Sequence, residues 1–428
     1  MSSTEDVSLT SNGGVSKPAL ARLPLGLALV CLLILGGSYV TNAMDRQVFS
    51  VLLPGISEDY GFPLSQGGLL STIFTLGIGV AGIPGAYLLN RYSRKTVIIL
   101  GIVIYSAFTA LTALSFGFFD MFAYRALSGV GEAIQNAALF AAVGAYFFKN
   151  RALAIGSLNF AYGVGAWLGP RLGGQFSEAF GAWHAPFYIF AAFGFVFVVL
   201  IALFVSKRFT EQVEDTGEAL ASTASDHLPT TLYNRNVVMF MISAAITGVA
   251  VYGYLGLYPT FLQQELGFSV VDSGTAVGMF GLGALMGIPA GLLGDRLNQR
   301  WILVVSLLAA SVIGFLLFNG PTDAASQNWL SFLEGTVGSG LLFTNTYSVM
   351  QRSVRPDMVG RVSGIFVTSW YLPSAIAGYL FAVLHDALGW GGASIVQLTL
   401  VPLIGVAALL FVDMKKVSTG RGIAAAHH

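Results

Sequence analysis

The chain of 428 residues is 55% hydrophobic and only 10% charged, and its mean hydropathy is +0.74. Soluble domains carry roughly 25% charged residues, so this composition excludes an ordinary soluble protein and predicts a chain that crosses a membrane several times. The net charge of zero gives no indication of a nucleic acid or an acidic partner, and the single cysteine, Cys31, excludes a disulfide framework.

Twelve apolar segments follow one another along the chain, each long enough to cross the hydrocarbon core as a helix of about 20 residues. We therefore predict an all-α membrane protein with twelve transmembrane helices. The predicted spans are 24–54, 66–89, 96–117, 121–147, 152–177, 184–206, 236–264, 272–294, 301–318, 329–351, 361–384 and 389–413. The polar segment 1–23 before them is predicted to be a disordered cytoplasmic tail.

The basic residues predict how the helices are oriented. Of the 21 Lys and Arg residues, 18 lie at the ends of the chain or in every second connection, and the connections between contain none. Because basic residues accumulate on the cytoplasmic side, we predict that both termini are cytoplasmic and that the protein lies in the plasma (inner) membrane. The other three basic residues, Arg46, Arg125 and Arg171, fall inside predicted spans.

Two motifs of the first six spans recur in the second six. "GFPLSQGGLLSTIF" (61–74) returns as "GFSVVDSGTAVGMF" (267–280), and "GIPGAYLLNRYSRK" (82–95) returns as "GIPAGLLGDRLNQR" (287–300). Two similar six-helix halves around a site at mid-membrane are typical of rocking transporters. We therefore predict an N-terminal half (24–206), a cytoplasmic linker (207–235), a C-terminal half (236–413) and a cytoplasmic tail (414–428).

This organisation resembles the major facilitator superfamily over residues 24–413. The family's loop signature after the second helix, Gly-x-x-x-Asp-Arg-x-x-x-Arg, is matched in the second half by Gly291, Asp295, Arg296 and Arg300. In the first half the corresponding "NRYSRK" (90–95) keeps Arg91 but has Asn90 at the acidic position. The resemblance implies a cytoplasmic gate formed by Arg91, Asp295, Arg296 and Arg300, weakened in the first half by the missing carboxylate.

Within the superfamily the motifs point in two directions. "NAMDR" (42–46) resembles the first-helix motif of the anion:cation symporters, which carry organic anions with protons, although Ala43 stands where an aromatic residue is usual. "RALSGVGEA" (125–133) and "NRYSRK" resemble the Spinster-type lipid carriers. "GAWLGPRLGG" (165–174) fits a pattern once linked with exporters. These residues therefore leave the substrate class and the direction of transport open.

Four charges within the predicted spans need an explanation, because each costs roughly 2.5 to 3.5 kcal/mol at the bilayer centre. Asp45 and Arg46 interrupt the first span, and Arg125 and Glu132 lie seven residues apart in the fourth. Seven residues place the second pair on one helix face but about 10.5 Å apart along the axis, so we expect each to find its partner in the first span. The alternative, a network that only fastens two helices, is weaker because buried ion pairs stabilise poorly compared with apolar packing.

We interpret Asp45 and Glu132 as the proton-coupling acids and Arg46 and Arg125 as the substrate-binding cations. Neutralising one acid would free a guanidinium, whose planar donors suit a carboxylate or a phosphate. The remaining predicted substrate-binding residues are uncharged: Tyr39, Asn42, Tyr162, Asn345, Trp370 and Tyr371.

Two further charges in the spans each have two possible roles. We interpret Arg171 equally as a snorkelling or vestibule residue and as a substrate contact. For Glu334 we prefer a rim position near the outer face to a role in a gate.

The sequence therefore predicts a proton-coupled symporter that carries an organic anion, a carboxylate, by alternating access. Its partners are the anion, protons and the lipid bilayer, with no nucleic acid, and we expect a monomer. We predict no cofactor and no metal site, and no enzyme, because the sequence shows neither a Ser/His/Asp set nor a sizeable domain outside the membrane. The alternative is a Spinster-like carrier or exporter of a lipid or amphiphile.

Overall fold

The computed structural model describes residues 22–147, 151–212, 228–355 and 358–418. All regular secondary structure in these ranges is helical, as predicted. Nearly all of the predicted N-terminal tail, the middle of the predicted linker and most of the predicted C-terminal tail lie outside the described residues.

The helices up to residue 210 follow the first six predicted spans and the start of the linker. They are α1 (Leu25–Tyr60), α2 (Leu64–Thr72), α3 (Phe74–Val80), α4 (Gly82–Arg91), α5 (Arg94–Thr112), α6 (Phe118–Tyr146), α7 (Arg151–Phe180), α8 (His184–Phe204) and α9 (Lys207–Thr210). The second predicted span is divided into α2, α3 and α4, and it bends by 47° between Leu64–Val80 and Pro84–Arg91.

The helices from residue 235 follow the remaining predicted spans. They are α10 (Arg235–Gln264), α11 (Val270–Ala284), α12 (Gly287–Arg296), α13 (Gln299–Asn319), α14 (Ala324–Gly335), the π-helix η3 (Thr336–Phe343), α15 (Thr344–Gln351), α16 (Val359–Ser374), α17 (Ala377–Ser394), the π-helix η5 (Ile395–Leu400), α18 (Val401–Leu410) and the 3₁₀ turn η6 (Met414–Lys416).

By length and apolarity, the described residues contain eight helices able to cross a membrane, or nine when the bent segment from Leu64 to Arg91 counts as one. One of the eight is the continuous run Val359–Leu410, whose 52 residues would measure about 78 Å as a straight helix, far more than one crossing needs. Gly389 interrupts this run with a positive φ of 70°, close to the predicted turn between 384 and 389. The full count of twelve spans stays a prediction.

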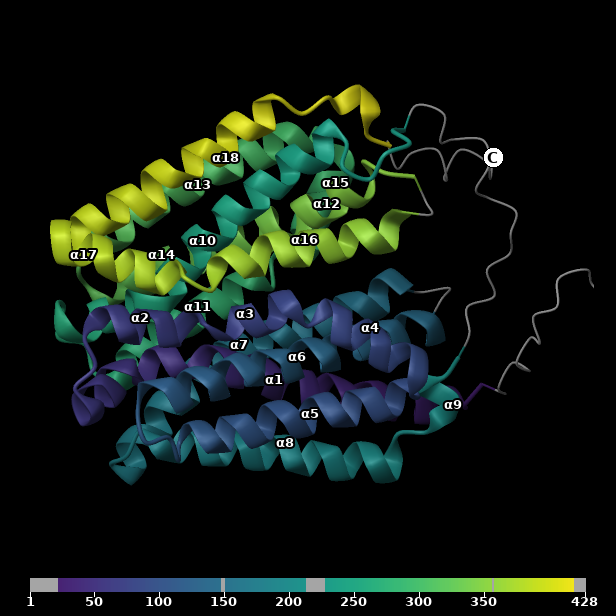
Figure 1. The fold of residues 1–428 in the computed structure, drawn as a ribbon, viewed down its shortest axis with the longest axis horizontal. Coiled ribbons are helices and arrows are strands. Elements are labelled where there is room, and N and C mark those ends of the chain that lie inside the picture. Colours follow the sequence, from purple (N-terminus) through teal and green to yellow (C-terminus); the bar gives the residue numbers. More distant parts are fainter. Residues whose placement is uncertain (1–21, 148–150, 213–227, 356–357, 419–428) are drawn as a thin grey trace, which may run out of the picture.

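Figure 1 shows the helices of residues 25–204 on one side of the molecule and those of residues 235–410 on the other. The two groups meet along α7 and α11, α2 and α17, and α3 and α16. Where α2 begins, the approach is so close that a Cβ on Gly68 would lie 2.4 Å from the carbonyl oxygen of Gly378. At the opposite end, a Cβ on Gly85 of α4 or Gly364 of α16 would meet nothing within 4 Å. The groups therefore approach each other closely at the end where α2 begins.

Candidate functional site

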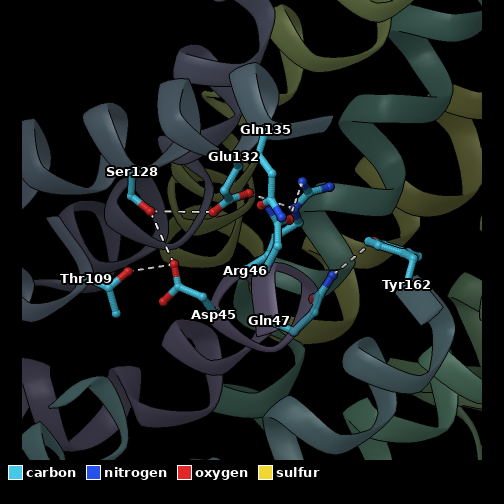
Figure 2. A network of polar contacts seen from close by, with 9 residues as sticks. Asp45, Arg46, Gln47, Thr109, Ser128, Glu132, Gln135 and Tyr162 are labelled. Atoms are coloured by element: carbon cyan, nitrogen blue, oxygen red, sulfur yellow. Dashed lines mark hydrogen bonds and ion pairs between the residues drawn. The ribbon is translucent and has the colours of Figure 1, made fainter. Parts of the chain in front are cut away.

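The core of the candidate site is a buried ion pair between α1 and α6. The Nε of Arg46 donates to Oε2 of Glu132 across 2.9 Å, and both side chains are buried (Figure 2). On α6 the residues Arg125, Ser128, Glu132 and Gln135 are three or four positions apart, so they share one face of the helix. That polar face turns toward α1, as the sequence predicts for Glu132.

A chain of amide contacts fixes the orientation of the Arg46 guanidinium. Its Nη2 donates to Oδ1 of Asn42 (3.3 Å), and Nδ2 of Asn42 donates to Oε1 of Gln135 (2.8 Å). Gln135 in turn donates to Oγ of Ser38 (3.1 Å). Because each amide uses both its donor and its acceptor, Arg46 has a position that does not depend on Glu132 alone.

Asp45 lies next to Arg46 in the sequence but faces different neighbours. Its Oδ2 accepts from the hydroxyl of Thr109 on α5 (2.7 Å) and from that of Ser128 on α6 (3.2 Å). Ser128 also lies 3.5 Å from Oε1 of Glu132, so one hydroxyl touches both carboxyl groups (Figure 2). A hydroxyl has one proton to donate, so both contacts are hydrogen bonds at once only if one of the two acids carries a proton.

Arg125 does not form the ion pair that we expected. It is fully buried, and none of its three guanidinium nitrogens has a hydrogen-bond partner among the described residues. The guanidinium instead lies over the rings of Phe49 (4.6 Å to the centroid) and Phe74 (5.2 Å), in cation–π contact. Asp45 is already bonded at Oδ2 by two hydroxyls, whereas its Oδ1 has no partner among the described residues. The pairing prediction is therefore confirmed for Glu132 and wrong for Arg125.

Aromatic side chains surround Arg46. The guanidinium lies 5.6 Å from the ring centre of Tyr162, which packs against Tyr39 at 6.0 Å. Tyr371 of α16 lies within electrostatic range of the same guanidinium, and its ring is 5.9 Å from that of Tyr252 on α10. Five predicted residues, Tyr39, Asn42, Arg46, Glu132 and Tyr162, thus gather around one point, and Tyr371 approaches it from the second group of helices.

Two predicted substrate residues lie elsewhere. The Nδ2 of Asn345 donates to the backbone oxygens of Leu341 (2.9 Å) and Ala290 (3.3 Å), which ties α15 to α12. Trp370 is buried against Phe343 (5.0 Å) and Phe366 (5.8 Å). Both side chains therefore serve helix packing in this conformation, and their contact with a substrate stays a prediction.

The rim position that we preferred for Glu334 is wrong, because the side chain is only 5% exposed. The reason is the start of the helix. Asp323 caps α14 by accepting from the backbone N–H of Ser326 (3.0 Å), so the helix begins at Ala324, five residues before the predicted span. Glu334 therefore lies ten residues into the helix, whereas the predicted span placed it five residues from the start. Arg171 is exposed, as the snorkelling interpretation requires.

The predicted gate residues are not joined by ion pairs within the described part of the chain. Arg91 donates to the hydroxyl of Tyr87 on its own helix (2.9 Å), and Arg296 is exposed in the last turn of α12. The Nε of Arg300 is buried without a partner among the described residues. The side chain of Asp295 lies outside the described part of the structure. The gate stays a prediction.

Sequence reasoning missed several hydrogen-bonding residues of the site. They are Ser38, Thr109, Ser128 and Gln135. The last two were accessible from spacing, since they lie four residues before and three after Glu132, on the same helix face. Neither Ser38 nor Thr109 has such a signal. The described residues contain no cluster of three His, Cys, Asp or Glu able to hold a metal ion.

Comparisons with known proteins identify the family and the fold. Residues 35–378 match the Major Facilitator Superfamily. The chain is 25% identical to the hexuronate transporter of Bacillus subtilis (strain 168) over 380 residues, covering 83% of this chain and 87% of the relative. It is 25% identical to the sphingosine-1-phosphate transporter SPNS2 of Danio rerio over 385 residues, covering 83% and 75%. A bacterial homologue of the human lysosomal transporter Spinster, solved in an inward-facing and occupied conformation, has the same fold, with a TM-score of 0.75, 17% identity, and 93% and 100% of the chains covered.

Proposed function

Because the chain belongs to the major facilitator superfamily and is thus a multi-pass membrane transporter, we propose that it is a proton-coupled symporter of an organic anion, a carboxylate, working by alternating access. The observation that carries this proposal is the buried Arg46–Glu132 pair at 2.9 Å. Protonating Glu132 removes the charge that occupies Arg46. The guanidinium, still held by Asn42, then offers its remaining donors to a carboxylate.

The balance of buried charges couples the binding of the proton to the binding of the anion. With every group ionised, Asp45, Arg46, Arg125 and Glu132 have formal charges that sum to zero. The sum is again zero when Glu132 carries a proton and a monocarboxylate binds. With the proton alone or the anion alone, one buried charge is uncompensated, which costs several kcal/mol in a low dielectric. The empty form and the fully loaded form are therefore the two that change conformation most easily, which is the requirement for symport.

Ser128 supports a proton path between the two acids. Its hydroxyl lies 3.2 Å from Asp45 and 3.5 Å from Glu132. Protonation of either carboxyl group therefore changes the hydrogen bond that Ser128 donates to the other. We assign Glu132 as the coupling acid because it pairs directly with Arg46, and Asp45 as the second acid of the same unit. The relatives are consistent with an acidic substrate, since one of them is named a hexuronate transporter.

Alternating access requires that the two groups of helices separate at the end where α2 begins. In our proposal the two halves, 24–206 and 236–413, rock about the site. The contact between Gly68 and Gly378 opens while the end that carries Arg91, Arg296 and Arg300 closes. Both termini and this second end face the cytoplasm in our proposal, as the distribution of Lys and Arg predicts.

The test is uptake into proteoliposomes from a panel of organic acids, with and without an imposed pH gradient that is acidic outside. We expect at least one carboxylate to accumulate only when the gradient is present, and a proton ionophore to abolish its accumulation. Accumulation that is independent of the gradient, in every case where uptake occurs, would exclude proton coupling.

A Spinster-like carrier of an anionic amphiphile is the second candidate. Tyr252 and Tyr371 lie next to each other beside Arg46, and the ring of Phe343 on η3 lies 6.5 Å from that of Tyr371 and extends this aromatic group. Such an aromatic group suits an alkyl chain attached to an anionic head group, and one relative is named a sphingosine-1-phosphate transporter. Thermal unfolding in a concentration series of short carboxylates and of lysolipids separates the candidates, because only the class that binds raises the unfolding temperature.

A further inference from the structure

A third buried acid, Glu334, lies in the C-terminal group of helices, apart from the charged network of α1 and α6. Glu334 follows ten residues after the start of α14, about 15 Å along the helix axis. Its side chain is 5% exposed, and Oε2 has no hydrogen-bond partner among the described residues. A charged carboxylate in such a place would have no hydrogen-bond donor among the described residues and little contact with water.

The surroundings of the carboxyl group are apolar. A Cβ placed on Gly338 would lie 3.7 Å from Oε1 of Glu334, 3.1 Å from Cγ2 of Val251 and 3.9 Å from a ring carbon of Phe280. The carboxyl group, a side chain of α10 and a side chain of α11 thus converge on one small space beside η3. Two hydroxyls of the neighbouring turns, those of Tyr254 and Ser331, form a hydrogen bond of 2.7 Å with each other.

No cation compensates this acid in the described structure. The elements around it are α10, α11, α13 and η3. Their titratable groups are Tyr252, Tyr254 and Tyr258 in the middle of α10, and Arg235, Asp272 and Arg300 in the first turns of α10, α11 and α13. The three tyrosines are uncharged hydroxyl groups. The two arginines begin their helices, and neither forms an ion pair with Glu334 among the described residues.

The backbone at this position is also unusual. The helix changes from α to π geometry at Thr336, two residues after Glu334, and stays so to Phe343. Segments of π-helix are rare and occur often at functional sites, because they can move a side chain relative to the regular helix. Glu334 therefore lies at a junction where its exposure can change with a small shift of the backbone.

We propose that Glu334 is a second proton-binding site, which holds a proton in the conformation described and releases it when the junction with η3 opens to water. A proton fits better than a metal cation, because the described residues place no second carboxylate beside Glu334 and the two nearby hydroxyls bond to each other. The site is separate from the one proposed at Glu132. It stands whether or not the substrate is an organic anion, and it adds a proton to those bound per transport cycle.

Infrared difference spectroscopy tests this proposal on the full chain in lipid nanodiscs, because a protonated carboxyl group has a carbonyl band that a carboxylate lacks. We expect the wild type to show such a band at neutral pH and Glu334→Gln to lose one carboxyl contribution. Glu265→Gln is the matched control, since Glu265 is exposed. Its spectrum should equal that of the wild type.

Two further variants keep the outcome interpretable. Glu334→Asp retains an acid one methylene shorter, so its band should persist at a shifted frequency even if Glu334→Gln folds poorly. Glu132→Gln should keep the Glu334 contribution, which separates this site from the proposed coupling acid. An unchanged protonated-carboxyl band in Glu334→Gln, or the absence of a band in Glu334→Asp, would overturn the proposal.

Discussion

The buried charges of the two groups of helices differ in kind. Between α1 and α6, two acids and two arginines form a set that is neutral as a whole. Arg46 bonds directly to Glu132, and Asp45 is linked to Glu132 through Ser128. Around α14, a single acid lies among apolar groups with no ion-pair partner in the described structure. When an acid of the neutral set takes up a proton, the arginine paired with it becomes free to bind an anion. An isolated acid can only gain or lose its own proton.

The largest expected effect comes from removing a charge from the neutral set. Arg125→Ala leaves the unit with a net negative charge and removes the contacts with Phe49 and Phe74. We expect the free energy of unfolding to fall by about 3 to 5 kcal/mol. Thermal unfolding in detergent measures the change, with Arg208→Ala as the control because Arg208 is exposed on α9. Equal unfolding temperatures for the two variants would show that Arg125 does not balance the buried acids.

A smaller effect is expected when the charge stays and only its geometry changes. Arg46→Lys keeps the neutral sum but cannot reach Glu132, Asn42 and a carboxylate together. Losing one charge-assisted hydrogen bond, about 1.5 to 3 kcal/mol, should weaken substrate binding roughly 10- to 100-fold while the protein stays folded. Titration calorimetry with the transported acid measures this, and Arg208→Lys is the control. Unchanged affinity would remove Arg46 from the binding site.

The smallest effect is expected from the aromatic side. Tyr371→Phe removes one hydroxyl within electrostatic range of Arg46 and leaves the ring contact with Tyr252 in place. If this hydroxyl forms one neutral hydrogen bond with the substrate, its loss removes about 0.5 to 1.5 kcal/mol of binding free energy. We therefore predict a roughly 2- to 10-fold rise in KM. Tyr379→Phe, on an exposed tyrosine of α17, should leave KM unchanged. If Tyr371→Phe impairs transport more than Arg46→Lys does, substrate recognition is not centred on α1 and α6.

The location of the charged site was predictable from the sequence, and its connections were not. Charges inside apolar spans identify Asp45, Arg46, Arg125 and Glu132, because hydropathy alone shows that they are costly. Adjacent residues on a helix point about 100° apart, so Asp45 and Arg46 contact different side chains. Which helix each one faces depends on packing. The residue spacing likewise does not predict that Arg125 stacks on Phe49 and Phe74.

The depth of Glu334 was misjudged for a local reason. Hydropathy places the start of its span at 329, whereas the Asp323 cap starts the helix at Ala324. The first turn of this helix contains polar residues, so a count of apolar residues begins the span too late. The π-helical segment η3 is equally invisible to periodicity, since it depends on contacts between helices.

The central claim is that Glu132 couples the proton to the anion by its pairing with Arg46. Glu132→Gln tests it most directly, because glutamine is nearly the same shape as protonated glutamic acid and leaves the guanidinium permanently free. Binding should persist and depend less on pH than in the wild type. The carrier can still exchange a loaded form for a loaded form, but it cannot return empty with its charges balanced.

The decisive measurement compares counterflow exchange with gradient-driven accumulation in proteoliposomes that contain Glu132→Gln. We predict that exchange survives at a rate comparable to the wild type while accumulation driven by the pH gradient falls at least about tenfold, the factor that 1.4 kcal/mol of lost coupling gives. If Glu132→Gln concentrates its substrate as well as the wild type does, Glu132 is not the coupling acid, and Asp45 takes its place.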